Sequence, residues 1–357
     1  MKKFRILAIN PGSTSTKVGI FEGGEMLREI KLSHSAQELA PYATVAAQFA
    51  FRKDIILEAV KSAGIDIASL DAVIGRGGLV KPISSGIYEV NEAMKHDLAE
   101  SRFGEHASNL GGLIAAEIAE RIGVKAYIAD PVVVDELQDV ARISGSPLML
   151  RLSIFHALNQ KAIARKYAAD NGAHYESLNL IIAHLGGGIS VAAHRKGMVV
   201  DVNNCLNGEG PIAPERAGTL PAAQLARLCF GGEHSEAQVL KMITGGGGLV
   251  ALLGTNDVRE VIARTADGDQ TAQLVLDAMC YSVGKSIGAA ATVLCGNVDA
   301  VILTGGIAHN KCVCDYVENM VSFIAPVTVI PGENELEALA SNAMMVLEGR
   351  TQPKVYC

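Results

Sequence analysis

Residues 71–78 read Asp-Ala-Val-Ile-Gly-Arg-Gly-Gly and residues 299–306 read Asp-Ala-Val-Ile-Leu-Thr-Gly-Gly, so six of eight positions are identical. A second pair of stretches, residues 9–20 and 183–193, repeats in the same order, and each contains two short apolar runs around a glycine-containing turn. Similarity that recurs in matching order indicates an internal duplication. The two offsets differ, so we expect the second half to carry an insertion somewhere between about 190 and 300.

Strand-like and helix-like segments alternate along most of the chain, which is typical of the α/β class. We expect a hairpin over 5–21 and short strands at 72–74, 126–128, 180–183, 199–202, 300–303 and 328–330. Helical periodicity appears at about 46–63, 105–122, 156–171, 221–230, 270–294 and 336–348. We predict a first domain of residues 1–150 that the C-terminal helix (336–357) rejoins, and a second domain of residues 151–335, with a cleft between the copies.

Composition limits the classes of function. The chain has 357 residues, 49% of them hydrophobic, a net charge of −7 and no Trp. So much apolar surface excludes disorder, and an acidic chain without stacking aromatics is a poor candidate for nucleic-acid binding. No signal peptide or membrane-spanning stretch is evident. We interpret the seven cysteines as reduced thiols of a cytoplasmic protein.

Two glycine- and hydroxyl-rich turns, at 10–17 and 184–190, are candidate phosphate sites. Backbone N–H groups and hydroxyls in such turns bind anions, although a tight turn alone would explain either one. Two better-known motifs, the P-loop and the hydrolase nucleophile elbow, do not match the sequence. Gly284-Lys285-Ser286 lacks the earlier glycine of a P-loop, and as a hydrolase elbow it would need a strand before the serine, where the periodicity is helical.

Charged residues follow several predicted strands or lie in glycine-rich loops. Arg76 and Asp130 come directly after apolar strands, His156 follows a short apolar run, and Arg216 lies in the loop 208–218. Ligands of α/β sheets bind at the carboxyl ends of strands. Each residue alone has an ordinary structural explanation. Together, two arginines, a histidine and a carboxylate suit stabilisation of a phosphoryl group in transfer.

Several long strings then carry a resemblance that covers nearly the whole chain, from residue 4 to about 347. ILAINPGSTSTK, GEHASNLG, DPVVVDE, SIFHALNQK, AHLGGGISVAAHRKG and DAVILTGGIAHNK resemble the acetate and butyrate kinases, and most closely the butyrate and branched-chain fatty acid kinases. This family belongs to the superfamily of acetate and sugar kinases, heat-shock chaperones and actin. The resemblance implies two duplicated ribonuclease-H-like (actin-like ATPase) domains that flank a nucleotide cleft.

The resemblance also implies an activity and a set of roles. The family transfers a phosphoryl group reversibly between MgATP and a short-chain carboxylate, forming an acyl phosphate and ADP. Arg76 and Arg216 would hold the carboxylate and the phosphoryl group, His156 would hydrogen-bond the phosphoryl group, and Asp130 would position it or support Mg²⁺. Glu335 would hold Mg²⁺. The implied nucleotide-binding positions are Asn10, Ser13, Ser15, Lys17, His184, Gly186, Gly187, Gly188, Asn256, Asp257, Arg259, Gly305, Gly306, Ile307 and Asn310. A homodimer is implied as well.

The chain departs from acetate kinases in two places. Gly77 and Gly78 follow Arg76 directly, where acetate kinases have bulkier residues, and Gln160 stands where they have a second histidine. We expect the lost bulk to leave room for a longer acyl chain, at about 0.8 kcal/mol per buried methylene. This favours butyrate or isobutyrate over acetate.

Two alternatives stay open at this point. A non-catalytic, actin-like nucleotide switch would keep both phosphate turns without needing Arg76, His156 and Arg216 together. A kinase of a hydroxyl substrate would need a carboxylate base, which Asp130 could supply.

Overall fold

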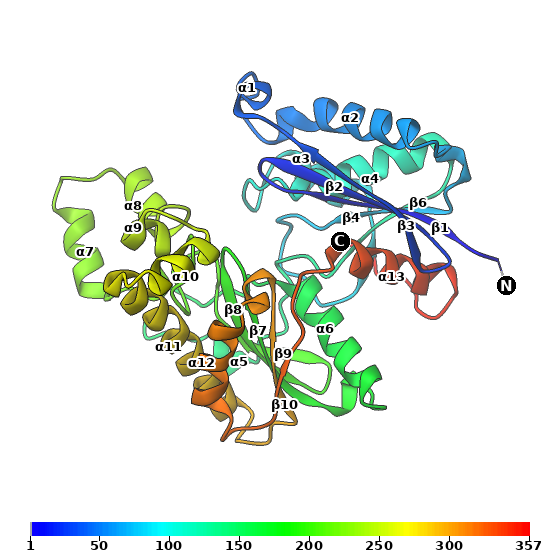
Figure 1. Ribbon diagram of the computed structural model, residues 1–357. Coiled ribbons are helices and arrows are strands. Elements are labelled where there is room, and N and C mark those ends of the chain that lie inside the picture. Colours follow the sequence, from blue (N-terminus) through cyan, green and yellow to red (C-terminus); the bar gives the residue numbers. More distant parts are fainter. Residues whose placement is uncertain (1) are drawn as a thin grey trace. The chain divides into compact units, whose positions relative to one another are not determined.

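The computed structural model describes residues 2–357, which divide into two compact units (Figure 1). Unit 1 comprises the described residues up to Val134 together with Asn334–Cys357, and unit 2 is Asp135–Glu333. The boundary that we predicted at residue 150 therefore lies at residue 134. Residues after it belong to unit 2 because, for example, the backbone N–H of Gln138 donates to the carbonyl oxygen of Val200.

Unit 1 contains one mixed sheet with the strand order β3-β2-β1-β4-β6-β5. The strands are β1 (Arg5–Pro11), β2 (Ser15–Glu22), β3 (Glu25–Ser33), β4 (Ala72–Arg76), β5 (Ile87–Glu89) and β6 (Lys125–Ala129). The helices are α1 (Ala36–Leu39), α2 (Phe49–Ser62), α3 (Glu92–Ala99), α4 (Asn109–Ile122) and α13 (Glu335–Leu347). The first three strands form an antiparallel meander, and β4 and β6 extend it in parallel from β1.

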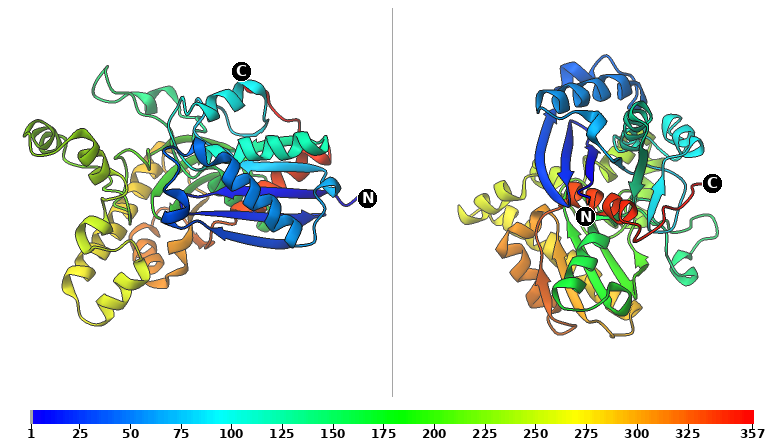
Figure 2. Two further views of the ribbon diagram at one scale, coloured as in Figure 1. Left: turned by 90° about the horizontal axis from the view of Figure 1, so that it is seen from above. Right: turned by 90° about the vertical axis from the view of Figure 1, so that its right-hand side faces the viewer.

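Helices cover both faces of this sheet (Figures 1 and 2). Leu7, Ile9 and Val73 point to the face that α2 and α4 cover, and they are buried against residues of those helices. On the opposite face α13 packs so closely that a Cβ at Gly19 would lie 3.4 Å from the Cβ of Leu336. Backbone contact at Gly75 is closer still, since a Cβ there would lie 2.1 Å from the carbonyl oxygen of Gly111 in α4. Glycine is thus required where α4 meets β4.

Unit 2 contains a second mixed sheet with the order β11-β10-β7-β8-β9. Its strands are β7 (Asn179–Leu185), β8 (Ile189–Arg195), β9 (Met198–Val202), β10 (Ala300–Thr304) and β11 (Val327–Val329). The helices are α5 (Asp139–Arg142), α6 (Ala157–Asp170), α7 (Ala222–Phe230), α8 (Glu236–Ile243), α9 (Leu249–Leu253), α10 (Val258–Ala266), α11 (Gln270–Val293) and α12 (Lys311–Val321). Helices α7 to α10 occupy the long connection between β9 and α11, where we predicted the insertion.

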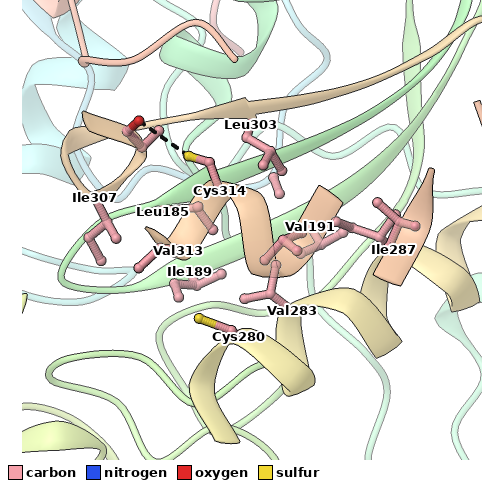
Figure 3. Packing of buried hydrophobic residues seen from close by; sticks show 14 of the residues in the cluster. Leu185, Ile189, Val191, Cys280, Val283, Ile287, Leu303, Ile307, Val313 and Cys314 are labelled. Carbon is pink, nitrogen blue, oxygen red and sulfur yellow. Dashed lines mark hydrogen bonds between the residues drawn. The ribbon is translucent and has the colours of Figure 1, made fainter. Parts of the chain in front are cut away.

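Alternation along β7 and β10 divides the core of unit 2 into two layers. Ile181 and Leu303 face α11 and α12, whereas Leu180 and Ile302 face α6. Figure 3 shows the first layer, in which Leu185, Ile189 and Leu303 from the strands meet Val283 and Ile287 of α11 and Val313 of α12. Since both faces of the sheet are covered by helices, the buried strands are nearly continuous apolar runs.

The two sheets confirm the duplication. The order β3-β2-β1-β4-β6 of unit 1 corresponds strand by strand to β9-β8-β7-β10-β11 of unit 2, with the same directions. The first residue of the repeated octapeptide also makes the same hydrogen bond in both units. The Asp71 carboxylate accepts a hydrogen bond from the backbone N–H of Arg5 at 2.8 Å, and the Asp299 carboxylate accepts one from Asn179 at 2.7 Å.

Most predicted elements are present, with ends displaced by at most about one turn. Gly284-Lys285-Ser286 lies inside α11, which confirms that it is neither a P-loop nor a hydrolase elbow. No helix within residues 2–357 is long and apolar enough to cross a membrane.

Candidate active site

Three predicted residues of unit 1 meet at the carboxyl end of its sheet. Arg76 ends β4, Asn10 lies on the neighbouring β1, and Glu335 is the first residue of α13. The Arg76 guanidinium contacts both carboxylate oxygens of Glu335, Nη2 to Oε1 at 3.0 Å and Nη1 to Oε2 at 3.2 Å. The amide nitrogen of Asn10 donates to the same carboxylate. The Arg76 guanidinium thus forms a bidentate ion pair with the Glu335 carboxylate.

Asp130 follows β6 and is held from one side. Its backbone has a φ of 39°, a left-handed conformation that aspartate tolerates better than most residues. The carboxylate is buried, and its Oδ1 accepts hydrogen bonds from Ser85 Oγ at 2.6 Å and from the Gly86 backbone N–H at 2.8 Å. These two hydrogen bonds fix the orientation of the Asp130 carboxylate.

The glycines after Arg76 do not leave open space, contrary to our expectation. A Cβ at Gly77 would lie 2.6 Å from the Cβ of Pro131, and one at Gly78 would lie 2.5 Å from the Cα of Asn109. The Asn109 side chain also accepts the backbone N–H of Leu79 at 2.8 Å. The two glycines therefore allow the chain to pack against Asn109 and Pro131, and they provide no extra room for an acyl chain.

The first candidate phosphate turn connects β1 to β2 and is backed by a buried arginine. Arg52 of α2 is 1% exposed, and its guanidinium donates to the backbone oxygens of Gly12 at 2.6 Å and Ser13 at 2.8 Å. Ser13 is exposed and Ser15 is half-buried. Lys17 lies directly across from Asn10 in the β1–β2 register, so their side chains share one face of the sheet. The Gly12 N–H donates to the Ser15 carbonyl oxygen at 2.7 Å, so the hydroxyls of Ser13 and Ser15 are the groups that the turn offers to an anion.

In unit 2, His156 and His184 stack on one another. His156 immediately precedes α6 and His184 lies on β7, and their ring centroids are 3.7 Å apart with planes 11° from parallel. His184 Nδ1 lies 2.9 Å from Asn159 Oδ1. His184 Nε2 is buried and has no hydrogen-bond partner within residues 2–357. A buried imidazole nitrogen without a partner is a candidate ligand contact.

The second candidate phosphate turn connects β7 to β8 at Gly186–Gly188, and Arg216 lies beside it. Arg216 Nη1 donates to Glu215 Oε2 at 3.1 Å and approaches the Gly187 carbonyl oxygen at 3.5 Å. Its Nε is buried and unpartnered in the described part of the chain. Glu215 thus holds Arg216 next to the turn while part of the guanidinium stays available to an anion.

A pocket of about 660 Å³ opens beside this turn, within the range of sites for small ligands. Most predicted adenosine positions line it, together with residues that sequence reasoning missed. The predicted lining residues are Gly186, Gly187, Asn256, Asp257, Arg259, Gly306, Ile307 and Asn310, and the additional ones are Pro214, Glu215, Val258, His309 and Glu333. Gly305 lies underneath, with a φ of 91° and no space for a Cβ against the Leu185 carbonyl oxygen.

One ion pair at this pocket organises its rim. Arg259 Nη2 lies 2.6 Å from Asp257 Oδ2, and Asp257 Oδ1 accepts the Arg259 backbone N–H at the start of α10. These hydrogen bonds lower the pKa of Asp257 to about 2.

Comparison with known proteins places the chain in a family. A family model described as the acetokinase family matches residues 146–343. Butyrate kinase 2 of Clostridium acetobutylicum is 54% identical over 354 residues, which cover 99% of each chain. The chain belongs to the acetokinase family. The probable butyrate kinase of Bacteroides thetaiotaomicron is also 54% identical, over 353 residues and 99% of each chain. The family resemblance inferred from the sequence is thereby confirmed.

Solved structures support the fold of this acetokinase. The crystal structure of Porphyromonas gingivalis acetate kinase aligns with a TM-score of 0.79 at 21% identity, covering 96% of this chain and 100% of that one. Acetate kinase of Entamoeba histolytica aligns with a TM-score of 0.76 at 16% identity, over 95% and 99% of the two chains. Together with the matching sheets, these likenesses confirm the predicted pair of actin-like domains.

The fit of Mg²⁺ to this acetokinase depends on few protein ligands. Within residues 2–357, no group of three or more His, Cys, Asp or Glu side chains is arranged to hold a metal ion. Mg²⁺ in kinases is usually bound by one or two carboxylates together with phosphate oxygens and water. The Glu335 carboxylate, 10% exposed, has the chemistry for such a site, and its oxygens retain lone pairs beyond those bonded to Arg76 and Asn10.

The structure thus groups the predicted residues of this acetokinase within each unit. Arg76, Asn10 and Glu335 are in direct contact in unit 1, whereas Asp130 is held separately by Ser85 and Gly86. His156 and His184 are in contact in unit 2, and Arg216 lies against the glycine turn that follows His184.

Sequence reasoning missed the residues that hold these groups in place. They are Arg52, Ser85, Asn109, Asn159, Ser190 and Glu215. Asn109, Asn159 and Ser190 lay inside strings that carried the family resemblance, but nothing in their own residue type marked them as supporting groups.

Proposed function

We propose that this chain is an ATP-dependent butyrate kinase, which converts butyrate or isobutyrate and ATP reversibly to an acyl phosphate and ADP. The observation that carries the proposal is 54% identity over 99% of the chain to proteins named butyrate kinase and probable butyrate kinase. The residues that such a reaction requires are present at the carboxyl ends of β4 and β7 and in the turns described above.

The chemistry needs no general base. A carboxylic acid with a pKa of about 4–5 is already ionised at neutral pH, so the carboxylate oxygen attacks the γ-phosphorus directly and the bond to the β-γ bridging oxygen breaks. The demand is electrostatic, because two anions must meet and the leaving ADP carries more charge. Arginine and histidine donors supply what this transition state needs.

Unit 1 would bind the acceptor. Arg76 forms a two-point ion pair with the Glu335 carboxylate, which supports our assignment of its guanidinium to the substrate carboxylate or the transferred phosphoryl group. Asn10, Ser13, Ser15 and Lys17 would contact phosphate. Glu335 would hold Mg²⁺ with support from Asp130, and the ion would neutralise phosphate charge.

Unit 2 would bind the nucleotide and the transferring group. The backbone of Gly186–Gly188 would contact phosphate, and the 660 Å³ pocket would hold adenosine between Asn256, Asp257 and Arg259 and the segment Gly305–Asn310. Arg216 and His156 would donate hydrogen bonds to the phosphoryl oxygens, and His184 would present its buried Nε2 to a hydrogen-bond donor that accompanies the nucleotide.

The test is transfer to a series of carboxylates. The protein is incubated with MgATP, hydroxylamine and acetate, propionate, butyrate, isobutyrate or valerate, and hydroxamate is measured. We expect the largest kcat/KM at four carbons, with a preference of about 10- to 200-fold per methylene at most. The highest kcat/KM with acetate would contradict the substrate assignment. ATP binding without hydroxamate from any acid would favour a nucleotide switch.

Two variants separate the chemistry from mere folding. Arg76→Ala should lower kcat/KM by about 10²- to 10³-fold, whereas Arg28→Ala, an exposed arginine on β3 of the same unit, should leave it unchanged. Asp130→Asn should weaken Mg²⁺ dependence and leave measurable transfer. Transfer to a hexose hydroxyl that Asp130→Asn abolishes would instead indicate a hydroxyl kinase.

We also propose a homodimer in the cytoplasm. Unit 2 exposes an apolar segment in which Ile143, Leu148, Met149 and Leu150 are 64–90% exposed, more than a solvated surface normally shows in one run. Light scattering after size exclusion should give twice the chain mass of 37.4 kDa. A monomer at micromolar concentration would contradict this assignment. Cys280 and Cys314 are buried thiols, as expected in a reducing compartment.

A further inference from the structure

A continuous run of hydrogen bonds leads from His156 into the core of unit 2. Ser190 Oγ lies 2.8 Å from His156 Nδ1, and Gln160 Nε2 lies 2.9 Å from the same hydroxyl. Gln160 Oε1 then lies 2.9 Å from His194 Nε2, and His194 Nδ1 lies 2.7 Å from the Tyr175 hydroxyl. Ser190, Gln160 and His194 are completely buried and Tyr175 is 4% exposed, so the hydrogen positions in this chain are set by the protein.

The orientation of the Gln160 amide fixes the first part of the chain. Gln160 Nε2 lies 3.1 Å from the backbone carbonyl oxygen of Ser190, which can only accept a hydrogen bond. The amide nitrogen is therefore on the Ser190 side, and Oε1 faces His194. Oε1 can only accept, so His194 must carry a hydrogen on Nε2.

His194 stays neutral, which fixes its other nitrogen. Complete burial and then the nearby Lys161 hold the pKa of His194 well below its usual value. With its one hydrogen on Nε2, His194 accepts the hydroxyl hydrogen of Tyr175 at Nδ1. The side-chain donors and acceptors of Gln160 and His194 are thereby all paired.

The same count determines what Ser190 does to His156. One N–H of Gln160 donates to the Ser190 carbonyl oxygen and the other to Ser190 Oγ. Ser190 Oγ also accepts from the backbone N–H of His156 at 3.5 Å, so both of its lone pairs are used and its hydroxyl hydrogen is directed to His156 Nδ1, 2.8 Å away. A neutral His156 that accepts at Nδ1 carries its own hydrogen on Nε2.

The stacked partner His184 is fixed in the opposite way. Asn159 Nδ2 donates to the Glu333 carbonyl oxygen at 2.8 Å, so Asn159 Oδ1 faces His184 Nδ1 and accepts its hydrogen. The Glu333 carboxylate lies 3.7 Å from His184 Nε2.

We propose that Gln160 and Ser190 are positioning residues that fix His156 in the Nε2–H form, so that it meets the phosphoryl group as a hydrogen-bond donor. Phosphoryl oxygens only accept hydrogen bonds, so the other neutral form of His156 would present a lone pair to them. No proton leaves the histidine in this role. The contribution to catalysis rests on the proposed function, whereas the hydrogen position is a property of the protein alone.

The hydrogen position can be measured without substrate. The full-length protein is labelled with ¹⁵N-histidine, and long-range ¹H–¹⁵N correlation spectra distinguish Nδ1–H, Nε2–H and doubly protonated rings. His156→Gln assigns the signal. We expect a neutral Nε2–H ring for His156 and a neutral Nε2–H ring for His194 at pH 7.5. A His156 ring with its hydrogen on Nδ1 would overturn the proposal, whatever the protein catalyses.

Gln160→Glu tests the consequence for the reaction. A carboxylate at this position cannot donate, so it would take the Ser190 hydroxyl hydrogen and force His156 to donate from Nδ1. We expect the His156 signal to change to Nδ1–H or to the doubly protonated form, and kcat to fall about 10- to 100-fold with KM for ATP and butyrate within twofold of wild type. An unchanged ring together with an unchanged kcat would contradict the proposal.

Two further variants separate positioning from simple destabilisation. Ser190→Ala removes the donor to His156 and should also lower kcat, by less than Gln160→Glu because either ring form is then accessible. Tyr175→Phe removes a buried hydrogen bond at the far end, where the direction of Gln160 does not depend on it. It should lower the midpoint of unfolding and leave kcat and the His156 signal unchanged. A kcat that simply follows stability across all three variants would show a structural role only.

Discussion

The two hairpin turns of this acetokinase occupy the same place in the two units, yet they are built differently. In unit 1 the turn after β1 carries serines and a threonine, and the charged Arg52 fills the space beneath it. In unit 2 the turn after β7 consists of three glycines, and the buried neutral base of that hairpin, His194, lies across from Leu180 at the other end of the strands. The duplicated sheet therefore fixes where each turn lies, whereas the side chains around each turn determine how it would hold a phosphate group under the proposed function.

The repeated glycine pairs after β4 and β10 differ in the same way. A Cβ at Gly78 would overlap Asn109, whereas one at Gly306 would meet nothing within 4 Å and Gly306 lines the large pocket. The second glycine of the repeated motif thus allows close packing in unit 1 and lines an open pocket in unit 2, whereas Gly305 is closely packed like its counterpart. After a duplication, similar sequence predicts where a residue lies in the fold but not what that residue does.

The largest effect should come from removing the cation under the first turn. Arg52→Met removes a completely buried guanidinium that donates to the backbone oxygens of Gly12 and Ser13, and we expect the free energy of unfolding to fall by about 3 kcal/mol. Chemical denaturation measures it. Lys61→Met, an exposed change on the same helix, is the control and should stay within about 0.5 kcal/mol of wild type. Equal stability of the two variants would mean that the turn does not depend on Arg52.

The next effect tests the packed glycine. Gly78→Ala places a Cβ about 2.5 Å from the Cα of Asn109, and we expect a loss of about 1–3 kcal/mol in unfolding free energy. The carboxylate preference of the folded variant should not change, since this space does not hold the acyl chain. A shift toward acetate without loss of stability would instead restore the view that Gly78 makes room for substrate.

The pH dependence of stability distinguishes the buried bases of the two units. Arg52 keeps its charge at every working pH, but His194 is neutral when folded and takes up a proton when unfolded at pH below about 6.5. Its depressed pKa therefore removes stability as the pH falls below 6.5, by up to about 1.4 kcal/mol per pH unit. Between pH 6.5 and 5, the free energy of unfolding of His194→Gln should therefore depend less steeply on pH than that of the wild type, by the uptake of up to one proton. The depressed pKa of His34 adds the same pH dependence to both proteins. Parallel curves would contradict the neutral state of His194.

Substitution of Gly306, which has open space at its Cβ position, should have the smallest effect on stability and a measurable effect on ATP binding. Gly306→Ala adds a methyl group to the wall of the pocket without a clash, so unfolding should change by less than about 0.5 kcal/mol. We expect ATP to bind about tenfold more weakly, which corresponds to 1.4 kcal/mol. Isothermal titration with MgATP measures this, and Gly296→Ala, whose position is outside the pocket residues, is a control for the added methyl group. Because Gly296 has a φ of 74°, its control readout is ATP affinity and not stability.

The sequence predicted the fold well because its signals were local and repeated. The hairpin over 5–21, the strand 300–303 and the helix 270–294 each had a clear apolar period, and the structure confirms them. The strand Glu25–Ser33 was missed because it lies at the edge of its sheet and most of its side chains are exposed. The insertion was placed but its helices α8, α9 and α10 were not, since helices of 8, 5 and 9 residues are too short for a clear apolar period.

The sequence predicted most of the charged residues of the candidate site. It did not predict the residues that hold those charged side chains in position. Arg76 and Glu335 are far apart in the chain, and only the resemblance linked them before their contact was seen. The role of Gly78 was misjudged because a missing side chain in the sequence does not tell whether a neighbour fills its space. Asn109, which fills it, is 31 residues away in the chain, and no local pattern could have indicated that contact.

The most direct test of the account is the reverse reaction, followed by ³¹P NMR with butyryl phosphate and MgADP. The account predicts that the acyl phosphate signal disappears as the three signals of ATP appear in equal amount, with no free inorganic phosphate, and that Arg76→Ala slows this exchange while ADP still binds. Butyryl phosphate that stays intact beside bound ADP, or that is hydrolysed to inorganic phosphate without ATP, would contradict the assignment of this acetokinase as a butyrate kinase.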